Sequence, residues 1–231
     1  MLHLWQRNDD VSDEKYAKRH KRRRAVIKET IRARILEAAL DLFHQKGYNR
    51  VSVDEIVERA QTSKGGFYHN FKSKDALLYE IHNVFISYVL AQTKKARASS
   101  TSPVEQLSAM LYAFTNVFEV YMRHITVFYN EVAYLPEQFE GMIHEKRTQY
   151  RRLIEEVIDE GKAQGVFRSN LSTTITTMAI IGMVNWTYKW YRHDGELTMT
   201  QITDYFNDVI LRGIVSEQQL SMLDSNHLKQ L

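Results

Sequence analysis

Residues 63–74, SKGGFYHNFKSK, combine hydrogen-bond donors, positive charge, aromatic rings and two adjacent glycines. The side chains able to contact base edges or phosphates are Ser63, Lys64, Tyr68, His69, Lys72 and Lys74. A glycine inside a helix costs about 1 kcal/mol relative to alanine, whereas a backbone without Cβ atoms can approach DNA closely. The pair Gly65 and Gly66 therefore indicates DNA contact. An ordinary surface turn would explain neither these glycines nor the spacing of Phe67 and Phe71, which we expect to point inward.

Two further segments are predicted to position this stretch. Residues 28–46 and 53–60 carry apolar side chains at the i, i+3, i+4 spacing of one helical face. Ser52 and Glu55 have the spacing of a capping box, which marks the start of the second helix. A tight turn then leads into the short helix within residues 63–74. Two short helices joined in this way form a helix-turn-helix, whose second helix enters the DNA major groove.

The charge distribution also indicates a polyanionic partner for the N-terminal part. Residues 1–75 contain 17 Lys and Arg against 11 Asp and Glu, whereas the rest of the chain contains 14 against 17. Seven of these cations lie within residues 15–24, KYAKRHKRRR. We expect residues 1–24 to form a flexible basic arm that touches phosphates or enters a minor groove. The alternatives are that the charge serves only solvation and that the arm is a solubilising tail.

The remainder of the chain is also predicted to be helical. Apolar periodicity and capping signals place helices near 74–93, 103–123, 125–134, 136–164, 172–192 and 201–215. Ser102 and Glu105 suggest another capping box, with Pro103 at the first helical position. With roughly nine helices and no convincing strand, the sequence predicts an all-α fold.

We expect three parts along the chain. These are the basic arm at 1–24, a helix-turn-helix domain at 25–75, and a ligand-binding and dimerisation domain at 76–231. Residues 172–192 are apolar on nearly all sides, so most of that helix should be covered. Pairing with residues 201–215 in a two-fold symmetric homodimer would cover it; an ordinary central core helix is the alternative.

The segment RILEAALDLFHQKGYNRVSVDEIVERAQTSKGGFYHNFKSKDALL closely resembles the N-terminal domain of the TetR family of transcriptional regulators, and the match covers about residues 32–78. The resemblance implies a ligand-responsive repressor that binds a palindromic operator as a dimer. Its implied DNA contacts in this chain are Ser52, Thr62, Ser63, Lys64, Gly65, Tyr68, His69 and Lys74. Gly66 departs from the family pattern, in which a larger residue, often threonine or alanine, is usual. This departure removes one side chain from base readout.

A second resemblance concerns the effector. Residues 145–156 (EKRTQYRRLIEE), 160–168 (EGKAQGVFR) and 185–192 (NWTYKWYR) resemble TetR-type repressors of fatty-acid degradation and of related acyl-CoA and steroid catabolism. The resemblance implies an acyl-CoA thioester as effector and control of fatty-acid or related acyl-CoA metabolism. The sequence departs from these relatives at His193, where proline is frequent.

Several residues could meet the parts of such a ligand. A thioester needs an apolar lining for its acyl chain, an aromatic face for adenine and cations for its phosphates. The candidates are Phe114, Phe118, Met122, Phe128, Met178, Arg147, Arg151, Trp186 and Trp190. The apolar members could equally be plain core, and the arginines could be solvated charges paired with glutamates at helical spacing. A TetR-type regulator that responds to drugs or other hydrophobic molecules is the competing interpretation.

The sequence gives little support to an enzyme. It has no Gly-x-Ser-x-Gly, no phosphate-cradling glycine loop and no His-x-x-x-His with a placed acid. We therefore expect no cofactor and no metal. The chain has no cysteine, no apolar signal region at its N-terminus and no apolar run of 18 residues. These features lead us to expect a cytoplasmic protein without a membrane span. A DNA-binding architectural protein without any ligand stays open as a further alternative.

Overall fold

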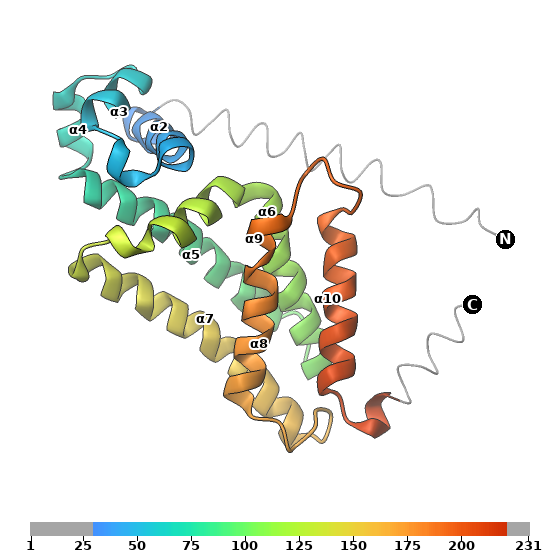
Figure 1. Ribbon diagram of the computed structural model, residues 1–231. Coiled ribbons are helices and arrows are strands. Elements are labelled where there is room, and N and C mark those ends of the chain that lie inside the picture. The colour runs from blue at the N-terminus through green and yellow to red at the C-terminus, as the bar shows by residue number, and fades with distance from the viewer. Residues whose placement is uncertain (1–29, 221–231) are drawn as a thin grey trace. The chain divides into compact units, whose positions relative to one another are not determined.

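The computed structural model describes residues 30–220, and within that range the fold is all-α (Figure 1). Nine α-helices and two short 3-10 turns are present there, with one isolated bridge between Phe167 and Val215 but no β-strand. The prediction of an all-α fold is confirmed for this part. The basic arm expected at residues 1–24 lies outside the described residues. The chain divides into two compact units, which meet between Leu78 and Tyr79.

The first unit contains three helices around a small apolar core. Its elements are α2 (Ile31–Lys46), the 3-10 turn η1 (Tyr48–Arg50), α3 (Val53–Arg59), α4 (Lys64–Asn70) and the start of α5 (Lys74–Arg97). Ile35, Phe43, Ile56 and Phe67 are almost completely excluded from solvent. Phe71 is buried as well, so the inward orientation expected for the two phenylalanines of residues 63–74 is confirmed. Burial of this kind stabilises a domain by about 1.5–3 kcal/mol for each large apolar side chain.

The turn between α3 and α4 sets the direction of the second helix. Gln61 adopts a left-handed conformation with φ of 51°. Its backbone N–H bonds to the Glu58 carbonyl at 3.0 Å, and the Thr62 N–H bonds to the Val57 carbonyl at 3.0 Å. This is the Schellman pattern that satisfies the last carbonyls of a helix. The chain therefore leaves α3 abruptly, as a helix-turn-helix requires.

The second unit is a bundle of longer helices. It contains the rest of α5, then α6 (Pro103–Glu131), the 3-10 turn η2 (Val132–Tyr134), α7 (Glu137–Ala163), α8 (Thr173–Asn185), α9 (Thr187–Trp190) and α10 (Met199–Ile214). Helix α6 packs against both α7 and α10, and α7 packs against α8. No helix among residues 30–220 is long and apolar enough to span a membrane.

Helix α6 differs from the sequence prediction in two respects. The segments expected at 103–123 and 125–134 are joined, with one non-helical residue, Tyr121 (φ −120°, ψ 21°), where the helix kinks. The predicted capping box is wrong, because the Ser102 side chain makes no capping bond. Instead, the Ser102 N–H donates to Ser100 Oγ at 3.0 Å, and the Ser100 hydroxyl donates to Glu105. Ser100 therefore links the Ser102 N–H to the Glu105 carboxylate just before the helix begins.

The single helix expected over residues 172–192 is also wrong. It is interrupted at Trp186, where the Lys189 N–H bonds to the Trp186 carbonyl at 3.0 Å in an i→i+3 pattern. Such a tightened turn changes the angular position of every following side chain. The direction of Trp190 therefore cannot be extrapolated from the apolar stripe of α8.

Replacing each of two glycines of α7 by alanine is predicted to change the free energy of unfolding in opposite directions. A Cβ on Gly161 would collide with the ring of the buried Phe167, whereas a Cβ on Gly141 would meet open space. We expect Gly161→Ala to lower the free energy of unfolding by about 1–3 kcal/mol through overpacking. Gly141→Ala should raise it by about 0.5–1 kcal/mol through helix propensity. Urea unfolding followed by circular dichroism measures both, and equal effects of the two substitutions would contradict this packing.

Candidate functional site

The exposed face of α4 carries the side chains predicted to read DNA. Lys64, Gly65, Tyr68 and His69 are exposed, whereas Phe67 between them is buried. Their i, i+1, i+4, i+5 spacing places these four residues on one side of the helix. Tyr68 leaves 56% of its surface accessible. A half-exposed aromatic ring flanked by cationic and imidazole groups is suited to contact base edges or phosphates.

The two glycines of α4 serve different purposes. A Cβ on Gly66 would collide with the Thr62 hydroxyl, so packing inside the protein favours a glycine at this position. A Cβ on Gly65 would have only Ser63 Oγ within 4 Å, at 3.7 Å. The Ser63 hydroxyl oxygen accepts from the Gly66 N–H at 3.1 Å and caps the helix. Close approach of the backbone to DNA stays a prediction for both glycines, and the contact with Thr62 gives a second reason for a glycine at position 66.

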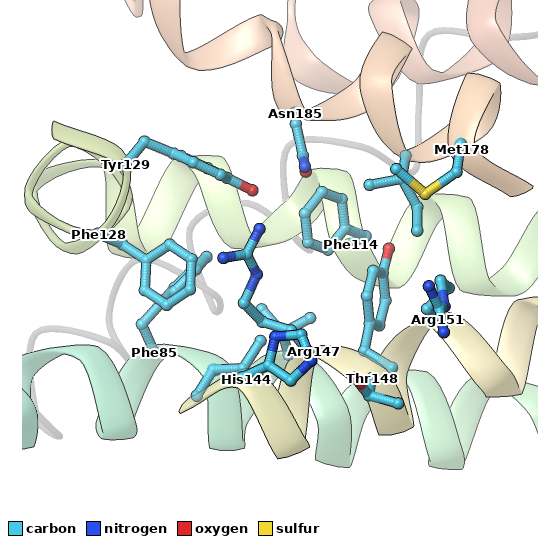
Figure 2. Close-up of a pocket in the computed structure, with 14 residues that line it drawn as sticks. Phe85, Phe114, Phe128, Tyr129, His144, Arg147, Thr148, Arg151, Met178 and Asn185 are labelled. Atoms are coloured by element: carbon cyan, nitrogen blue, oxygen red, sulfur yellow. The ribbon is translucent and has the colours of Figure 1, made fainter. Parts of the chain in front are cut away.

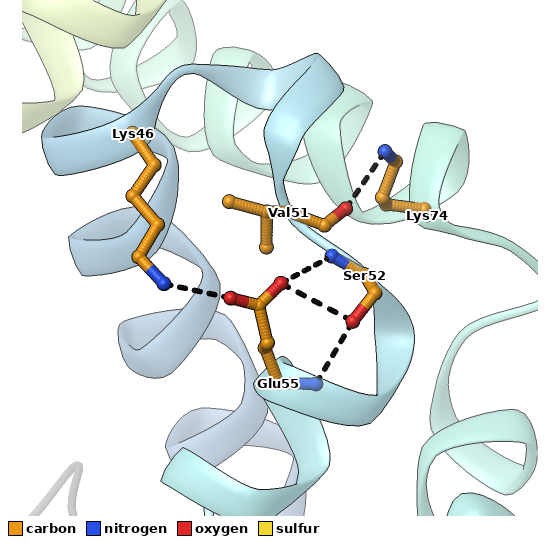
Figure 3. A network of polar contacts seen from close by, with 5 residues as sticks. All are labelled: Lys46, Val51, Ser52, Glu55 and Lys74. Atoms are coloured by element: carbon orange, nitrogen blue, oxygen red, sulfur yellow. Dashed lines mark hydrogen bonds and ion pairs between the residues drawn. The ribbon is translucent and has the colours of Figure 1, made fainter.

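The start of α3 is fixed by a polar network in which Ser52 and Glu55 cap each other (Figure 3). The Ser52 N–H donates to Glu55 Oε2 at 2.8 Å, and the Glu55 N–H donates to Ser52 Oγ at 3.2 Å. Lys46 Nζ approaches Glu55 Oε1 at 2.7 Å. The Lys46 ammonium and the Ser52 N–H lower the pKa of Glu55 to about 2. The capping box predicted here is confirmed, and it already uses the Ser52 hydroxyl, which the family resemblance assigns to DNA contact.

The lysines predicted to meet phosphates are not equivalent. Lys74 Nζ donates to the carbonyl of Val51 at 2.9 Å and to that of Tyr48 at 3.1 Å (Figure 3 shows the Val51 bond). Burial lowers its pKa. Lys64 forms an exposed ion pair with Asp54 at 2.8 Å, which a phosphate could replace, and Lys72 is exposed. The structure thus gives Lys74 a bracing role within the first unit and leaves Lys64 and Lys72 better placed for phosphates.

The second unit contains a cleft of about 200 Å³ between its helices (Figure 2). Helices α5, α6, α7 and α8 all contribute to it. Its apolar and aromatic lining consists of Phe85, Ile86, Val89, Phe114, Phe128, Tyr129, Tyr150, Met178 and Ile181. Its polar lining consists of His144, Arg147, Thr148, Arg151 and Asn185. None of these fourteen residues is acidic, so the charge inside the cleft is positive.

Three polar side chains from different helices converge in this cleft. Figure 2 shows the Tyr129 hydroxyl from α6, the Arg147 guanidinium from α7 and the Asn185 amide from α8 directed toward one another. Arg147 lies 5.9 Å from the centre of the Phe128 ring and makes no ion pair within residues 30–220. Burial raises the pKa of Tyr129, so its hydroxyl stays protonated and able to donate. These three groups leave both donors and an acceptor available to a bound molecule.

One face of α7 supplies both arginines of the cleft together with two further polar side chains. His144, Arg147, Thr148 and Arg151 follow the i, i+3, i+4, i+7 spacing of a single helical face. Arg147 and His144 are exposed at the open side of the cleft. Arg151 is ion-paired with Glu155 at 3.5 Å, so its charge is partly compensated. Within residues 30–220, no three His, Asp or Glu side chains gather as a metal site.

An aromatic stack forms part of the cleft wall. The rings of Phe114 and Tyr150 are stacked with centroids 5.3 Å apart, and Phe118 packs edge-on against Phe114 at 5.9 Å. Burial raises the pKa of Tyr150, which keeps this hydroxyl neutral. Stacked rings of this kind are held in place by their neighbours. The wall therefore limits how far an apolar group can extend into the unit.

The residues predicted from sequence to bind a ligand are only partly brought together. The cleft contains Phe114, Phe128, Arg147, Arg151 and Met178 but not Phe118, Met122, Trp186 or Trp190. Phe118 is buried in the core, and Trp186 is 63% exposed on the surface. Sequence reasoning missed His144 and Thr148, although their spacing from Arg147 on one helical face could have indicated them. Tyr129 and Asn185 carry no such sequence signal, because only the packing of three helices places them together.

An apolar surface covers parts of α8 and α10. Ile175 on α8 is 69% exposed, Trp186 directly after α8 is exposed as well, and Tyr205 and Val209 are exposed on α10. Helix α8 buries only Thr177, Ile180 and Val184 within its own unit. Exposed apolar side chains that lie close together are typical of surfaces that contact another protein, a membrane or a ligand.

Comparison with known proteins agrees with this division into a helix-turn-helix and a cleft-bearing unit. Residues 35–81 match the family described as bacterial regulatory proteins, tetR family, and residues 100–214 match the tetracyclin repressor-like C-terminal domain. The chain is 26% identical over 187 residues to the HTH-type transcriptional repressor KstR2 of Mycobacterium tuberculosis. That alignment covers 80% of this chain and 94% of the relative.

Two solved structures extend the comparison. The ketosteroid transcriptional regulator KstR2 of Mycobacterium tuberculosis superimposes with a TM-score of 0.75 at 25% identity, covering 82% of this chain and 97% of the other. AibR in complex with isovaleryl coenzyme A and operator DNA superimposes with a TM-score of 0.71 at 28% identity, covering 78% and 97%. The helix-turn-helix, the helical second unit and both family matches along one chain show that this protein is a transcriptional repressor of the TetR family.

Proposed function

We propose that this protein is a dimeric repressor that leaves its operator when the CoA thioester of a compact acid occupies the cleft. One observation carries this proposal: an apolar cleft without any acidic lining presents Arg147, a cation with no ion-pair partner within residues 30–220. Guanidinium donors bind carbonyl, carboxylate and phosphate oxygens strongly. A ligand with an apolar body and oxygen acceptors fits these groups.

The volume of the cleft argues for a compact acyl group. Pockets for drug-sized ligands usually measure about 300–1,000 Å³, whereas this cleft measures about 200 Å³. A whole CoA molecule exceeds that volume, so its nucleotide part would remain outside. The exposed side chains of His144 and Arg147 stand at the open side, where such a nucleotide would begin. The acyl group would occupy the apolar part beside Phe114 and Met178.

Charge argues against a cationic drug as the effector. Such a ligand would add a third positive charge to those of Arg147 and Arg151, with no carboxylate in the lining to compensate it. A neutral hydrophobic molecule, such as a ketosteroid, is the second candidate. The similarity to the ketosteroid regulator KstR2 favours it, but the cleft would have to expand to admit a body of that size. The similarity to AibR with bound isovaleryl coenzyme A favours the compact thioester.

Helix α5 offers a mechanical link between effector and DNA. It starts at Lys74 in the first unit and lines the cleft with Phe85, Ile86 and Val89 in the second. Lys146, beside Arg147 on α7, donates to Asn83 and, at 2.6 Å, to Ser87 of α5. A ligand that moves Arg147 would therefore pull on α5 through Lys146. Coupling of this kind typically changes operator affinity by about 5- to 150-fold.

Effector specificity is the first test of this proposal. An operator fragment, enriched from random DNA by the protein itself, is titrated with isovaleryl-CoA, a long-chain acyl-CoA, free isovalerate and free CoA. We expect release at the lowest concentration with isovaleryl-CoA, because the cleft is small and the thioester adds polar contacts. Fluorescence anisotropy of the labelled fragment reports release. Release by free isovalerate alone, or by none of the four, would refute the proposal.

The same assay includes a matched pair of arginine variants on α7. Arg147→Gln should need about 10- to 150-fold more thioester for release, because a hydrogen bond to a charged group contributes about 1.5–3 kcal/mol. Arg152→Gln removes the same charge from an exposed position outside the cleft and should match the wild type. Both variants should bind the operator normally without ligand. Equal shifts in the two variants would show a general charge effect instead of a binding site.

Substitutions in and next to α4 can distinguish base-specific contacts from phosphate contacts. Tyr68→Ala should reduce discrimination between operator and random DNA by about tenfold or more, because it removes a side chain from the groove-facing surface. Lys72→Ala should weaken binding to both DNAs alike and reduce the log–log salt slope by about 0.9 per protomer. Lys95→Ala, an exposed lysine of the second unit, serves as the control. A change in salt slope without a change in discrimination for Tyr68→Ala would contradict its role in base readout.

We also propose that α8 and α10 form the dimer interface. A glutamate placed in the middle of such a surface would be buried without a partner, which is strongly unfavourable. Ile175→Glu should therefore yield a monomer with greatly weakened operator binding, as measured by sedimentation velocity and anisotropy. Met142→Glu introduces the same charge at an exposed apolar position of α7 and should remain a dimer. A dimeric Ile175→Glu variant would place the interface elsewhere.

A further inference from the structure

Asn185 has an unmet hydrogen-bonding requirement inside the cleft. Its Oδ1 atom is buried and, within residues 30–220, accepts no hydrogen bond. Figure 2 shows its amide directed into the cleft, toward the Tyr129 hydroxyl and the Arg147 guanidinium. A buried acceptor that has lost water and gained no donor is unfavourable, so such atoms are normally satisfied by a partner. A bound ligand can supply that partner here.

The neighbours of Asn185 define what the ligand must offer. Arg147 can only donate hydrogen bonds, and the protonated Tyr129 hydroxyl donates readily. The Asn185 carbonyl oxygen can only accept. A ligand that satisfies all three groups therefore carries an acceptor oxygen and, a short distance away, an N–H or O–H donor. A simple carboxylate has the acceptor but lacks the donor.

We propose that Asn185 determines effector specificity by accepting a hydrogen bond from the pantetheine amide N–H nearest the thioester. The thioester carbonyl oxygen then faces Arg147 and Tyr129. This assignment rests on the proposed function and identifies the part of the CoA thioester that the protein recognises by hydrogen bonds. It explains selection against both hydrolysis products, because the free acid lacks the amide N–H and free CoA lacks the acyl carbonyl.

The pantetheine amide fits as the hydrogen-bond donor to Asn185 better than a hydroxyl group on the acid itself. Only two methylene groups separate the thioester sulfur from this amide, so both polar groups can lie within one small cleft. The cleft is open on the side of the exposed His144 and Arg147, which gives the rest of the pantetheine arm a way out. A 3-hydroxy acid presents a similar donor and acceptor pair, and it is therefore included as a separate arm of the test.

The test measures direct binding by titration calorimetry to the full-length protein. The ligands are S-isovaleryl-pantetheine, its analogue methylated on the amide nitrogen nearest the sulfur, and 3-hydroxyisovalerate. The proteins are the wild type, Asn185→Leu and the control Asn130→Leu, which changes an exposed asparagine of α6 outside the cleft. Methylation should weaken binding about tenfold in the wild type and in Asn130→Leu, the effect of losing one hydrogen bond. Asn185→Leu should bind both thioesters with about the same affinity.

Each other outcome overturns the assignment in a recognisable way. An equal loss on methylation in Asn185→Leu would show a steric effect, and tight binding of 3-hydroxyisovalerate would assign the donor to a hydroxyl group. If the wild type tolerates methylation, Asn185 does not accept from this amide although the thioester still binds. If the wild type binds no thioester, the proposed function fails together with this assignment. Should Asn185→Leu not fold by circular dichroism, tolerance of methylation by the wild type still overturns the assignment.

Discussion

The feature on which the second unit depends is a guanidinium in an apolar cleft that offers it no carboxylate. Arg147 lies near the Phe128 ring and points toward Tyr129 and Asn185, and none of the fourteen lining residues is acidic. A guanidinium that lines an apolar cleft and has no carboxylate partner there can donate charge-assisted hydrogen bonds to an oxygen acceptor that enters. The cleft is therefore prepared for an anionic or strongly polarised acceptor attached to an apolar body, and this requirement narrows the range of possible effectors.

Adjacent residues of α7 contact different parts of the second unit, so α7 joins the cleft to α5. Arg147 faces the cleft, while Lys146 holds Asn83 and Ser87 of α5. Farther along, Arg97 of α5 is ion-paired with Glu156 and with Glu160 of α7. Since α5 also begins in the DNA-binding unit, the proposed switch transmits a displacement of α7 through α5. The ligand contributes to switching only by the difference in its affinity for the two arrangements.

Much of the first unit could be predicted from sequence because its signals are local. The capping pair Ser52 and Glu55, and the burial of Phe67 and Phe71, follow from residue type and helical spacing. The roles of Gly66 and Lys74 could not be predicted in this way, because they depend on Thr62 and on the carbonyls of Tyr48 and Val51. Prediction from local signals is harder still in the second unit, because only tertiary packing brings Asn185 and Tyr129 close to Arg147. The break at Trp186, one residue after Asn185, is likewise not marked by glycine or proline.

Thermodynamic reciprocity gives the most direct test of the central claim that cleft occupancy and operator binding oppose each other. The affinity of isovaleryl-CoA is measured by calorimetry for the free protein and for the protein saturated with its operator fragment. Operator should weaken thioester binding by the same factor by which thioester weakens operator binding, on the order of 5- to 150-fold. Equal thioester affinity with and without operator would show that the cleft and the helix-turn-helix are not coupled, and it would contradict the proposed switch.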